Sequence, residues 1–179
     1  MPVRALSLSA QSAVLIDARD GRILYEKDAD TPRPMASTTK IMTAIVAIEN
    51  GDVNEIIEIT DEAVGVEGSS IYLQKGEKMT LLELLYALLL QSANDAAVAI
   101  AVGVGGSVEG FAQMMNEKAL ELGLTSTHFE NPNGLDSNGH VTTARELALL
   151  TAYALKDPTF AEIVSTYKRK ISGPDGGVR

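Results

Sequence analysis

The feature that most restricts how this sequence can fold is a leucine-rich segment over residues 80–90. It opens with Thr80-x-x-Glu83, a capping box, in which the two side chains satisfy N–H groups at the start of a helix. Apolar residues lie on nearly all sides of the helix that follows, so other elements must surround it. Polar residues interrupt the apolar run before Gly106, which leaves no stretch of the roughly 18 apolar residues that a membrane span needs. We therefore expect this helix at the centre of a globular fold.

The remaining segments predict several more helices and a few short strands. A β-hairpin is expected over residues 12–16 and 22–27, with a turn at Asp20-Gly21. Further strands are expected at residues 55–60 and from 168 to 171. Helices are expected over residues 37–49 (Ser37 as N-cap), 95–102 (Asp95 as N-cap), 107–122, 143–156 (a second capping box, Thr143 and Glu146) and from Asp157-Pro158 onward.

Helices outnumber strands in this pattern, and no regular βαβ alternation appears. These features predict an α+β domain, in which a helical cluster of about residues 60–165 packs on a mainly antiparallel sheet. The chain of 179 residues is long enough for one domain with a real core.

Composition removes several kinds of site from consideration. The chain has no cysteine, which excludes disulfides, a thiolate nucleophile, zinc-thiolate sites and iron–sulfur clusters. It has two histidines, His128 and His140, which are too few for a His-rich metal site. We expect no cofactor and no metal. A net charge of −9 disfavours nucleic acid and anionic membrane surfaces as partners.

The first candidate for chemistry is Ser37-Thr38-Thr39-Lys40. Residues three apart share a helix face, so the Lys40 amine would stand one turn above the Ser37 hydroxyl. A serine becomes nucleophilic when a base takes its proton, and a lysine can do this when burial lowers its pKa. The unpaired N–H groups at the helix start would favour a developing oxyanion. A capping serine and a surface lysine would give the same short pattern.

The second candidate is Ser92-Ala93-Asn94, at the seam between two apolar helices. Polar residues buried there are costly unless they find hydrogen-bond partners. Asp95 is accounted for as the cap of the next helix, whereas Ser92 and Asn94 are less easily explained. The pair could reach a cavity beside Ser37, relay a proton and hold a substrate amide.

Together, Ser37-x-x-Lys40 and Ser92-x-Asn94 resemble the signature of penicillin-binding proteins and serine β-lactamases. Longer blocks are similar to the low-molecular-mass D-alanyl-D-alanine carboxypeptidases of peptidase family S11. These ordered blocks fall at residues 13–25, 35–44, 68–73, 89–97, 131–136 and 139–144. The resemblance implies a DD-peptidase/serine β-lactamase-like fold, with residues 1–179 as the N-terminal part of a single transpeptidase-like catalytic domain.

The resemblance also implies a two-step acyl transfer, sensitive to β-lactams. Ser37 would attack the carbonyl between the two D-alanines of a peptidoglycan stem peptide, while Lys40 takes its proton. Ser92 would pass a proton to the leaving D-alanine, and Asn94 would bind the substrate amide and help to place Lys40. β-Lactam antibiotics would acylate Ser37 as mimics of the D-Ala-D-Ala end. The family implies an extracytoplasmic location, and no signal peptide is visible over residues 1–10.

One family feature has no counterpart in this sequence, which contains no Lys-Thr-Gly or Lys-Ser-Gly motif. Lys170-Ile171-Ser172-Gly173 has an extra residue, which on a strand would turn one side chain to the opposite face. The resemblance therefore implies truncation before this third motif, with later sheet strands and a C-terminal helix missing. We expect little or no activity from residues 1–179 alone, because one lost oxyanion donor costs about 10²–10³ in rate. Open sheet edges would invite self-association.

Two alternative functions remain open. A serine β-lactamase would need a deacylating glutamate, and no segment after Ser92 clearly offers one. A non-catalytic protein that binds the cell wall or regulates there could keep the fold without the third motif, but the intact set at Ser37, Lys40, Ser92 and Asn94 argues against it.

The other polar residues are interpreted as structural. His140 is expected to fix the loop before the helix at Thr143, and His128 is expected at the surface. Asn131, Asn133 and Asp136 lie in a Gly/Pro turn and are expected to make turn hydrogen bonds.

Overall fold

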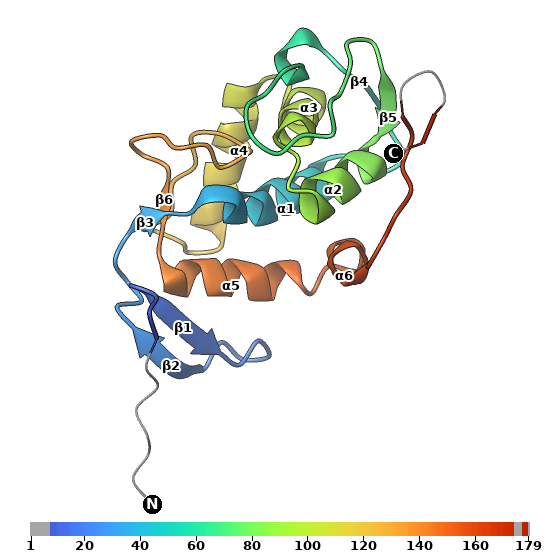
Figure 1. The fold of residues 1–179 in the computed structure, drawn as a ribbon. Coiled ribbons are helices and arrows are strands. Elements are labelled where there is room, and N and C mark those ends of the chain that lie inside the picture. The colour runs from blue at the N-terminus through green and yellow to red at the C-terminus, as the bar shows by residue number, and fades with distance from the viewer. Residues whose placement is uncertain (1–7, 174–176, 179) are drawn as a thin grey trace, which may run out of the picture.

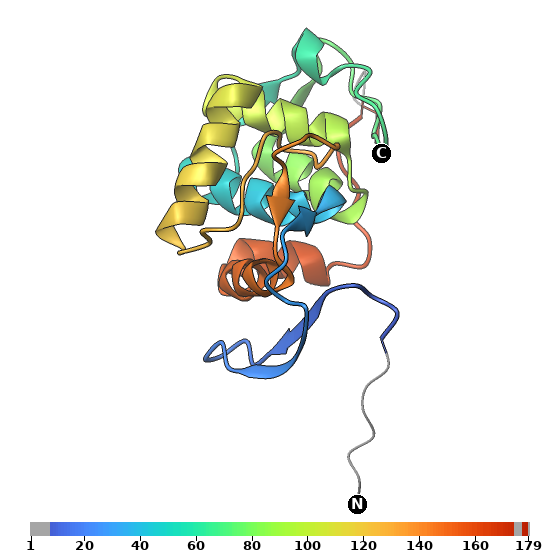
Figure 2. The ribbon, with the colours of Figure 1, turned by 90° about the vertical axis from the view of Figure 1, so that its left-hand side faces the viewer.

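A computed structural model describes residues 8–173 and 177–178. Its centre is helix α3 (Asn94–Gly105), which packs against α1 (Lys40–Asn50), α2 (Leu81–Leu90) and α4 (Val108–Glu121). Residues 94–101 of α3 are all buried, and most of them are small, so the neighbouring helices approach closely on every side. Figure 1 shows α1, α2 and α3 stacked together, and Figure 2 shows α4 along one side of the stack.

Helix α2 is buried as its sequence predicts. Four of its leucines, at positions 81, 84, 85 and 88, are almost completely excluded from solvent. The capping box is confirmed, because Thr80 Oγ1 accepts from Glu83 N while Glu83 accepts from Thr80 N. The most enclosed helix is nevertheless α3, since α2 leaves Leu82, Leu89 and Leu90 only partly buried.

The predicted hairpin forms from β1 (Ala13–Ile16) and β2 (Ile23–Lys27), paired antiparallel. It lies beneath α5 (Ala144–Ala154), which is followed by α6 (Pro158–Ser165) (Figure 1). Arg145 at the start of α5 forms ion pairs with Glu26 and Asp30, which attach the hairpin segment to the helical cluster.

Two further antiparallel pairs complete the sheet structure among the described residues. Strand β4 (Ile56–Glu58) pairs with β5 (Lys78–Thr80), and β3 (Arg33–Pro34) pairs with β6 (Val141–Thr142). Two short 3₁₀ helices, η1 (Ala36–Thr39) and η2 (Asp61–Ala63), lie between these elements. The β3–β6 pair matters most for the site, because it brings the start of η1 beside the loop of residues 128–142. The α+β class with antiparallel pairing is therefore confirmed.

Four local expectations are wrong. Ser37 is not an N-cap, because it lies inside η1, and the cap positions of η1 and α1 make no side-chain bond. Asp95 is not an N-cap either, because α3 begins one residue earlier and the carboxylate binds a neighbouring loop. At α5, Thr143 caps Glu146 N, but the Glu146 carboxylate binds residues 126–127 instead of completing the box.

The fourth concerns residues 168–171, which form no strand. A strand needs a neighbouring backbone, and the segment has no ladder partner among the described residues. The adjacent Ser172 makes an isolated bridge with Val178 and donates to the Glu83 carboxylate. Within the described chain, no single helix is long and apolar enough to span a membrane, although α3 and α4 together, bent by 83°, pass that test.

Candidate active site

Ser37 lies in η1, on the exposed side of the helical cluster. The residue before it, Ala36, has a left-handed backbone with φ of +46°. Alanine rarely adopts this conformation, which costs about 1–2 kcal/mol. The Ser37 N–H lies in the first turn, where backbone N–H groups have no partner within the helix. The nucleophile candidate thus leaves a strained turn at the start of a helix, with an N–H beside its hydroxyl.

Lys40 is buried beside Ser37, among three polar groups. Only 2% of its surface is exposed, although a lysine is seldom buried unless it has partners. Its Nζ lies 2.7 Å from Asn94 Oδ1, 2.6 Å from the Asn133 carbonyl oxygen and 3.4 Å from Ser37 Oγ. Burial lowers the pKa of Lys40 to about 8, because a charged amine loses its hydration there.

These distances define what a neutral Lys40 amine could do. A neutral amine has two N–H groups and one lone pair. The Asn94 and Asn133 oxygens are acceptors only, and their short contacts use both N–H groups. The lone pair then remains for the third neighbour, the Ser37 hydroxyl. A separation of 3.4 Å is long, but hydrogen bonds of this kind often tighten when a substrate binds.

Asn94 joins Lys40 to the loop that precedes β5. Its Oδ1 accepts from Lys40, and its Nδ2 donates to the Glu67 carbonyl at 2.7 Å, which fixes the orientation of the amide. A side chain at Gly68 would place its Cβ 2.6 Å from Asn94 Nδ2, so this close approach depends on glycine. The expected placement of Lys40 by Asn94 is present. The expected contact with a substrate amide stays a prediction.

Asp95 holds the same loop from the next position. Its buried carboxylate accepts from Ser70 Oγ at 2.6 Å and from the N–H groups of Ile71 and Leu73. This anchoring explains why two polar residues stand at the seam of two apolar helices: Asn94 and Asp95 satisfy a loop that would otherwise have unpaired backbone groups. Asp95 was expected to cap its own helix, because an acidic residue near a helix start is compatible with either role.

Ser92 lies between α2 and α3 and is half-buried. Its φ is +54°, a left-handed conformation that usually carries glycine at the end of a helix. Among the described residues, no hydrogen bond joins Ser92 Oγ to Ser37 or Lys40. The structure thus brings Ser37, Lys40 and Asn94 into contact and leaves Ser92 outside the hydrogen-bonded set.

The loop before β6 supplies two backbone acceptors that the sequence did not reveal. Lys40 donates to the Asn133 carbonyl, and Thr43 donates to the Pro132 carbonyl at 2.6 Å. Carbonyl groups occur in every residue, so no sequence signal marks them as part of a site. The expected turn bonds are present at two positions: Asn131 Oδ1 accepts from Gly134 N, and Asn133 Oδ1 accepts from Leu135 N.

His140 fixes this loop, as expected, and also touches η1. It is buried, accepts from Glu130 N at Nδ1, and lies 2.6 Å from Thr39 Oγ1 through Nε2. Burial lowers the pKa of His140 below its usual value, which favours the neutral ring. His128 is exposed, as expected.

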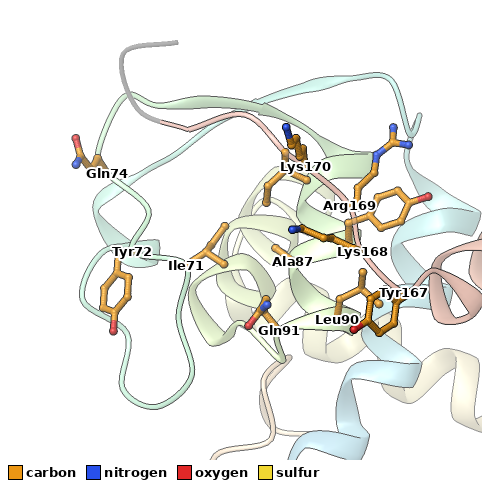
Figure 3. A pocket seen from close by; sticks show the side chains of 12 residues that line it. Ile71, Tyr72, Gln74, Ala87, Leu90, Gln91, Tyr167, Lys168, Arg169 and Lys170 are labelled. Atoms are coloured by element: carbon orange, nitrogen blue, oxygen red, sulfur yellow. The ribbon is translucent and has the colours of Figure 1, made fainter. Parts of the chain in front are cut away.

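A cavity of about 640 Å³ lies near the site, beside the C-terminal end of α2. Figure 3 shows Tyr72 and Gln74 on one side, Leu90 of α2 and the following Gln91 below, and residues 167–170 on the other side. Neither Ser37 nor Lys40 lines it. Ser172 is bound to Glu83 in the first turn of α2, about 10 Å of helix away from Leu90, the last residue of α2, and Ser92 follows that end. The described residues contain no cluster of acidic or histidine side chains suited to a metal.

Comparison with known proteins identifies relatives of this chain. A family model described as D-alanyl-D-alanine carboxypeptidase matches residues 1–173. The D-alanyl-D-alanine carboxypeptidase DacF of Bacillus subtilis is 39% identical over 168 residues, which cover 91% of this chain and 43% of that protein. DacA of Escherichia coli is 36% identical, again over 91% of this chain and 43% of the relative. The chain thus spans less than half the length of these two relatives.

Solved structures agree with the sequence matches. A D-alanyl-D-alanine carboxypeptidase from Mycobacterium tuberculosis superposes with a TM-score of 0.93 at 31% identity, covering 99% of this chain and 68% of that one. A mutant of the Streptomyces K15 DD-transpeptidase gives a TM-score of 0.88 at 34% identity, over 97% of this chain and 72% of that one.

Proposed function

This chain belongs to the D-alanyl-D-alanine carboxypeptidase family, and we propose that the protein is a serine-type carboxypeptidase acting on peptidoglycan stem peptides that end in D-Ala-D-Ala. Ser37 is the proposed nucleophile and Lys40 the proposed base. Penicillin-type β-lactams would be covalent inhibitors at Ser37. We further propose that residues 1–179 form the N-terminal part of one transpeptidase-like catalytic domain, which accords with the 43% coverage of two relatives.

The observation that carries this proposal is the arrangement around Lys40 Nζ. Two short contacts to obligate acceptors use both N–H groups of a neutral amine, and Ser37 Oγ lies 3.4 Å from the same nitrogen. A pKa of about 8 leaves about a tenth of the amine neutral at pH 7, far more than the ordinary lysine pKa would. A surface lysine beside a capping serine would have neither property.

The proposed reaction has two steps. Ser37 Oγ forms a bond to the carbonyl carbon between the two D-alanines, and its proton passes to Lys40. The C–N bond then breaks, and the terminal D-alanine leaves with a proton delivered through Ser92. Water hydrolyses the resulting ester, which returns Ser37 to its starting state. Asn94 keeps Lys40 in place and would offer its remaining N–H to the substrate.

Two further proposals concern the cellular location of the protein and its self-association. We propose an extracytoplasmic location, as the resemblance in the sequence implies, and fractionation of the producing cells would test it. Self-association is proposed through the β1–β2 hairpin, in which each strand pairs on one side only. Leu15 and Leu24 of this hairpin are 56% and 53% exposed. A second copy paired along this edge predicts a dimer of residues 1–179 in size-exclusion chromatography with light scattering; a monomer would contradict it.

Covalent labelling by a fluorescent penicillin tests the function. Labelling should occur in the natural chain that includes residues 1–179, should disappear in Ser37→Ala, and should persist in the control Ser165→Ala, whose exposed hydroxyl bonds only its own helix. Residues 1–179 alone should label weakly or not at all. The natural chain, assayed before any penicillin is added, should release D-alanine from a peptide that ends in D-Ala-D-Ala.

The same assay separates the alternatives. Rapid hydrolysis of nitrocefin, without accumulation of labelled protein, would identify a serine β-lactamase. Absence of both labelling and hydrolysis in the natural chain would indicate a non-catalytic protein of this fold and would overturn the proposal.

A further inference from the structure

The Ala36 carbonyl is held from two directions. Thr39 Oγ1 donates to it at 2.7 Å. From the loop before β6, the backbone of Gly134 comes so close that a Cβ there would stand 2.0 Å from the same oxygen. Ala36 has a left-handed backbone and directly precedes Ser37, so the orientation of its carbonyl sets the direction in which Ser37 leaves the turn.

His140 stands behind the Thr39 hydroxyl. Its Nδ1 accepts from Glu130 N at 3.0 Å and therefore carries no hydrogen. The remaining hydrogen of a neutral ring must then be on Nε2, which lies 2.6 Å from Thr39 Oγ1. A hydroxyl that accepts from His140 is free to donate its own hydrogen to the Ala36 carbonyl. The three groups form a chain of hydrogen bonds with one direction: His140, Thr39, Ala36.

We propose that neutral His140 is a positioning residue for Ser37, acting through the Thr39 hydroxyl on the Ala36 carbonyl. This inference rests on the proposed function and extends it. It gives the hydrogen-bonded chain from His140 through Thr39 to Ala36, here called the relay, a part in acylation beyond fixing the loop. Its contact with Glu130 holds the loop, while its contact with Thr39 holds the nucleophile turn. The two contacts use different ring nitrogens, so they can be separated by substitution.

Protonation of His140 would disrupt its contact with the Glu130 N–H. A charged imidazole carries a hydrogen on Nδ1, which would face the Glu130 N–H, so that two donors would point at each other. The ionisable side chains near the ring on its own loop are Glu130, His128 and Asp136, and Lys40 is the one on residues 36–40. Burial lowers the pKa of His140, so this arrangement should be lost only at a pH below the usual histidine range, as a second fall in acylation below the one set by Lys40.

Two substitutions at His140 separate the contacts. In His140→Gln, the amide nitrogen reaches the position of Nε2 and can donate to Thr39, but the acceptor for Glu130 N is lost. In His140→Asn, the amide oxygen reaches the position of Nδ1 and can accept from Glu130, but the donor to Thr39 is lost. The proposal predicts near-normal acylation for His140→Gln, and a rate about 10- to 100-fold lower for His140→Asn, the range expected for a misplaced nucleophile. Equal rates, or a slower His140→Gln, would overturn it.

Thr39 provides a second pair that does not depend on the folding of the His140 variants. Thr39→Val removes the hydroxyl and should be as slow as His140→Asn, whereas Thr39→Ser should restore the rate. Thr39→Val acylating at the wild-type rate would contradict the relay. These rates are measured with fluorescent penicillin on the natural chain, with thermal melts of each variant as a check on folding.

Nuclear magnetic resonance of the natural chain that includes residues 1–179 tests these hydrogen bonds without any reaction. Across the titration of His140, the ¹⁵N shifts should report the Nε2–H tautomer at neutral pH, and the Ser37 amide should shift with the same midpoint. In Thr39→Val the Ser37 amide should no longer follow His140. A Ser37 amide that ignores this titration in the wild type would overturn the positioning role. A natural chain that is not acylated, with the titration coupling intact, would refute the proposed function alone.

Discussion

Lys40 and Ser92 are both polar residues set among apolar helices, but the structure treats them differently. Lys40 is 2% exposed and has three polar neighbours, one each from η1, α3 and the loop before β6. Ser92 is half-buried and is held in a left-handed conformation, outside the hydrogen bonds of the other site residues. The contacts of Lys40 are suited to the proposed proton transfer from Ser37. Ser92 makes no contact with this set, and its distinctive feature is a strained backbone.

The contrast shows which parts of the chemistry the described chain already organises. In the proposed mechanism, abstraction of the Ser37 proton needs Lys40, Asn94 and one loop carbonyl, and all are in contact. Delivery of a proton to the leaving group would need Ser92 to approach a substrate. Substitutions should therefore have large effects on acylation at Lys40, smaller ones at Asn94, and the smallest at Ser92.

Lys40→Met should have the largest effect. Methionine can fill the space of the lysine stem but cannot accept a proton, so acylation by fluorescent penicillin should fall by about 10²–10⁴. The control is Lys156→Met, which removes a lysine that is exposed. The rate constants should be compared in the natural chain, with thermal melts to show that each variant folds. Lys40→Met acylating at nearly the wild-type rate would remove Lys40 from the role of base.

The sequence predicted well the features that local interactions determine. The capping box at Thr80 and Glu83 forms within one turn, and Asp157 caps Phe160 N directly before Pro158. The Ser37–Lys40 contact was also predicted, because residues three apart share one side of a helical turn, here the turn that joins η1 to the start of α1. Such features depend on few residues, all close in the chain.

The features that the sequence did not reveal depend on residues far apart. Asp95 and Glu146 both stand near helix starts, yet both bind neighbouring loops, and only the packing of those loops decides between the two uses. The Asn133 carbonyl is 93 positions from Lys40 and has no distinctive chemistry in the sequence. In that turn, Gly134 is the residue whose type marks the backbone conformation, since its φ of +88° favours a residue without a side chain.

The pH dependence of acylation tests Lys40 and Asn94 together. Lys40 must be neutral to act as a base, so the wild-type rate should rise with pH and level off above about 8. In Asn94→Asp, a carboxylate would replace the amide oxygen 2.7 Å from Nζ and favour the charged amine. The pKa should then rise by about 1 unit or more, and the rate at pH 7 should fall at least about tenfold. Asn54→Asp, exposed and distant in the chain, is the control.

The stability of the fold should follow the same titration. The pKa of Lys40 in the folded chain is lower than in the unfolded chain, where it is near 10.5. The unfolded chain therefore binds more protons between these two values, and stability should rise with pH across that range. Below about pH 8 the cost of burying the charged amine is fully present. For the acylation experiment on Asn94→Asp, a pH profile of the rate with the same midpoint as the wild type would contradict the assignment of that titration to Lys40.

Ser92 should give the smallest effect on acylation and a distinct effect on stability. Ser92→Ala and Ser92→Gly both remove the hydroxyl, so both should slow acylation equally, and less than the Lys40 and Asn94 variants do. They differ in backbone cost, because alanine keeps the strain of a φ of +54° and glycine does not. Ser92→Gly should therefore be more stable than Ser92→Ala by about 1 kcal/mol in urea unfolding. Equal stability would show that the turn relaxes when the serine is removed, and a faster Ser92→Gly would assign the role of Ser92 to its backbone and not to its hydroxyl.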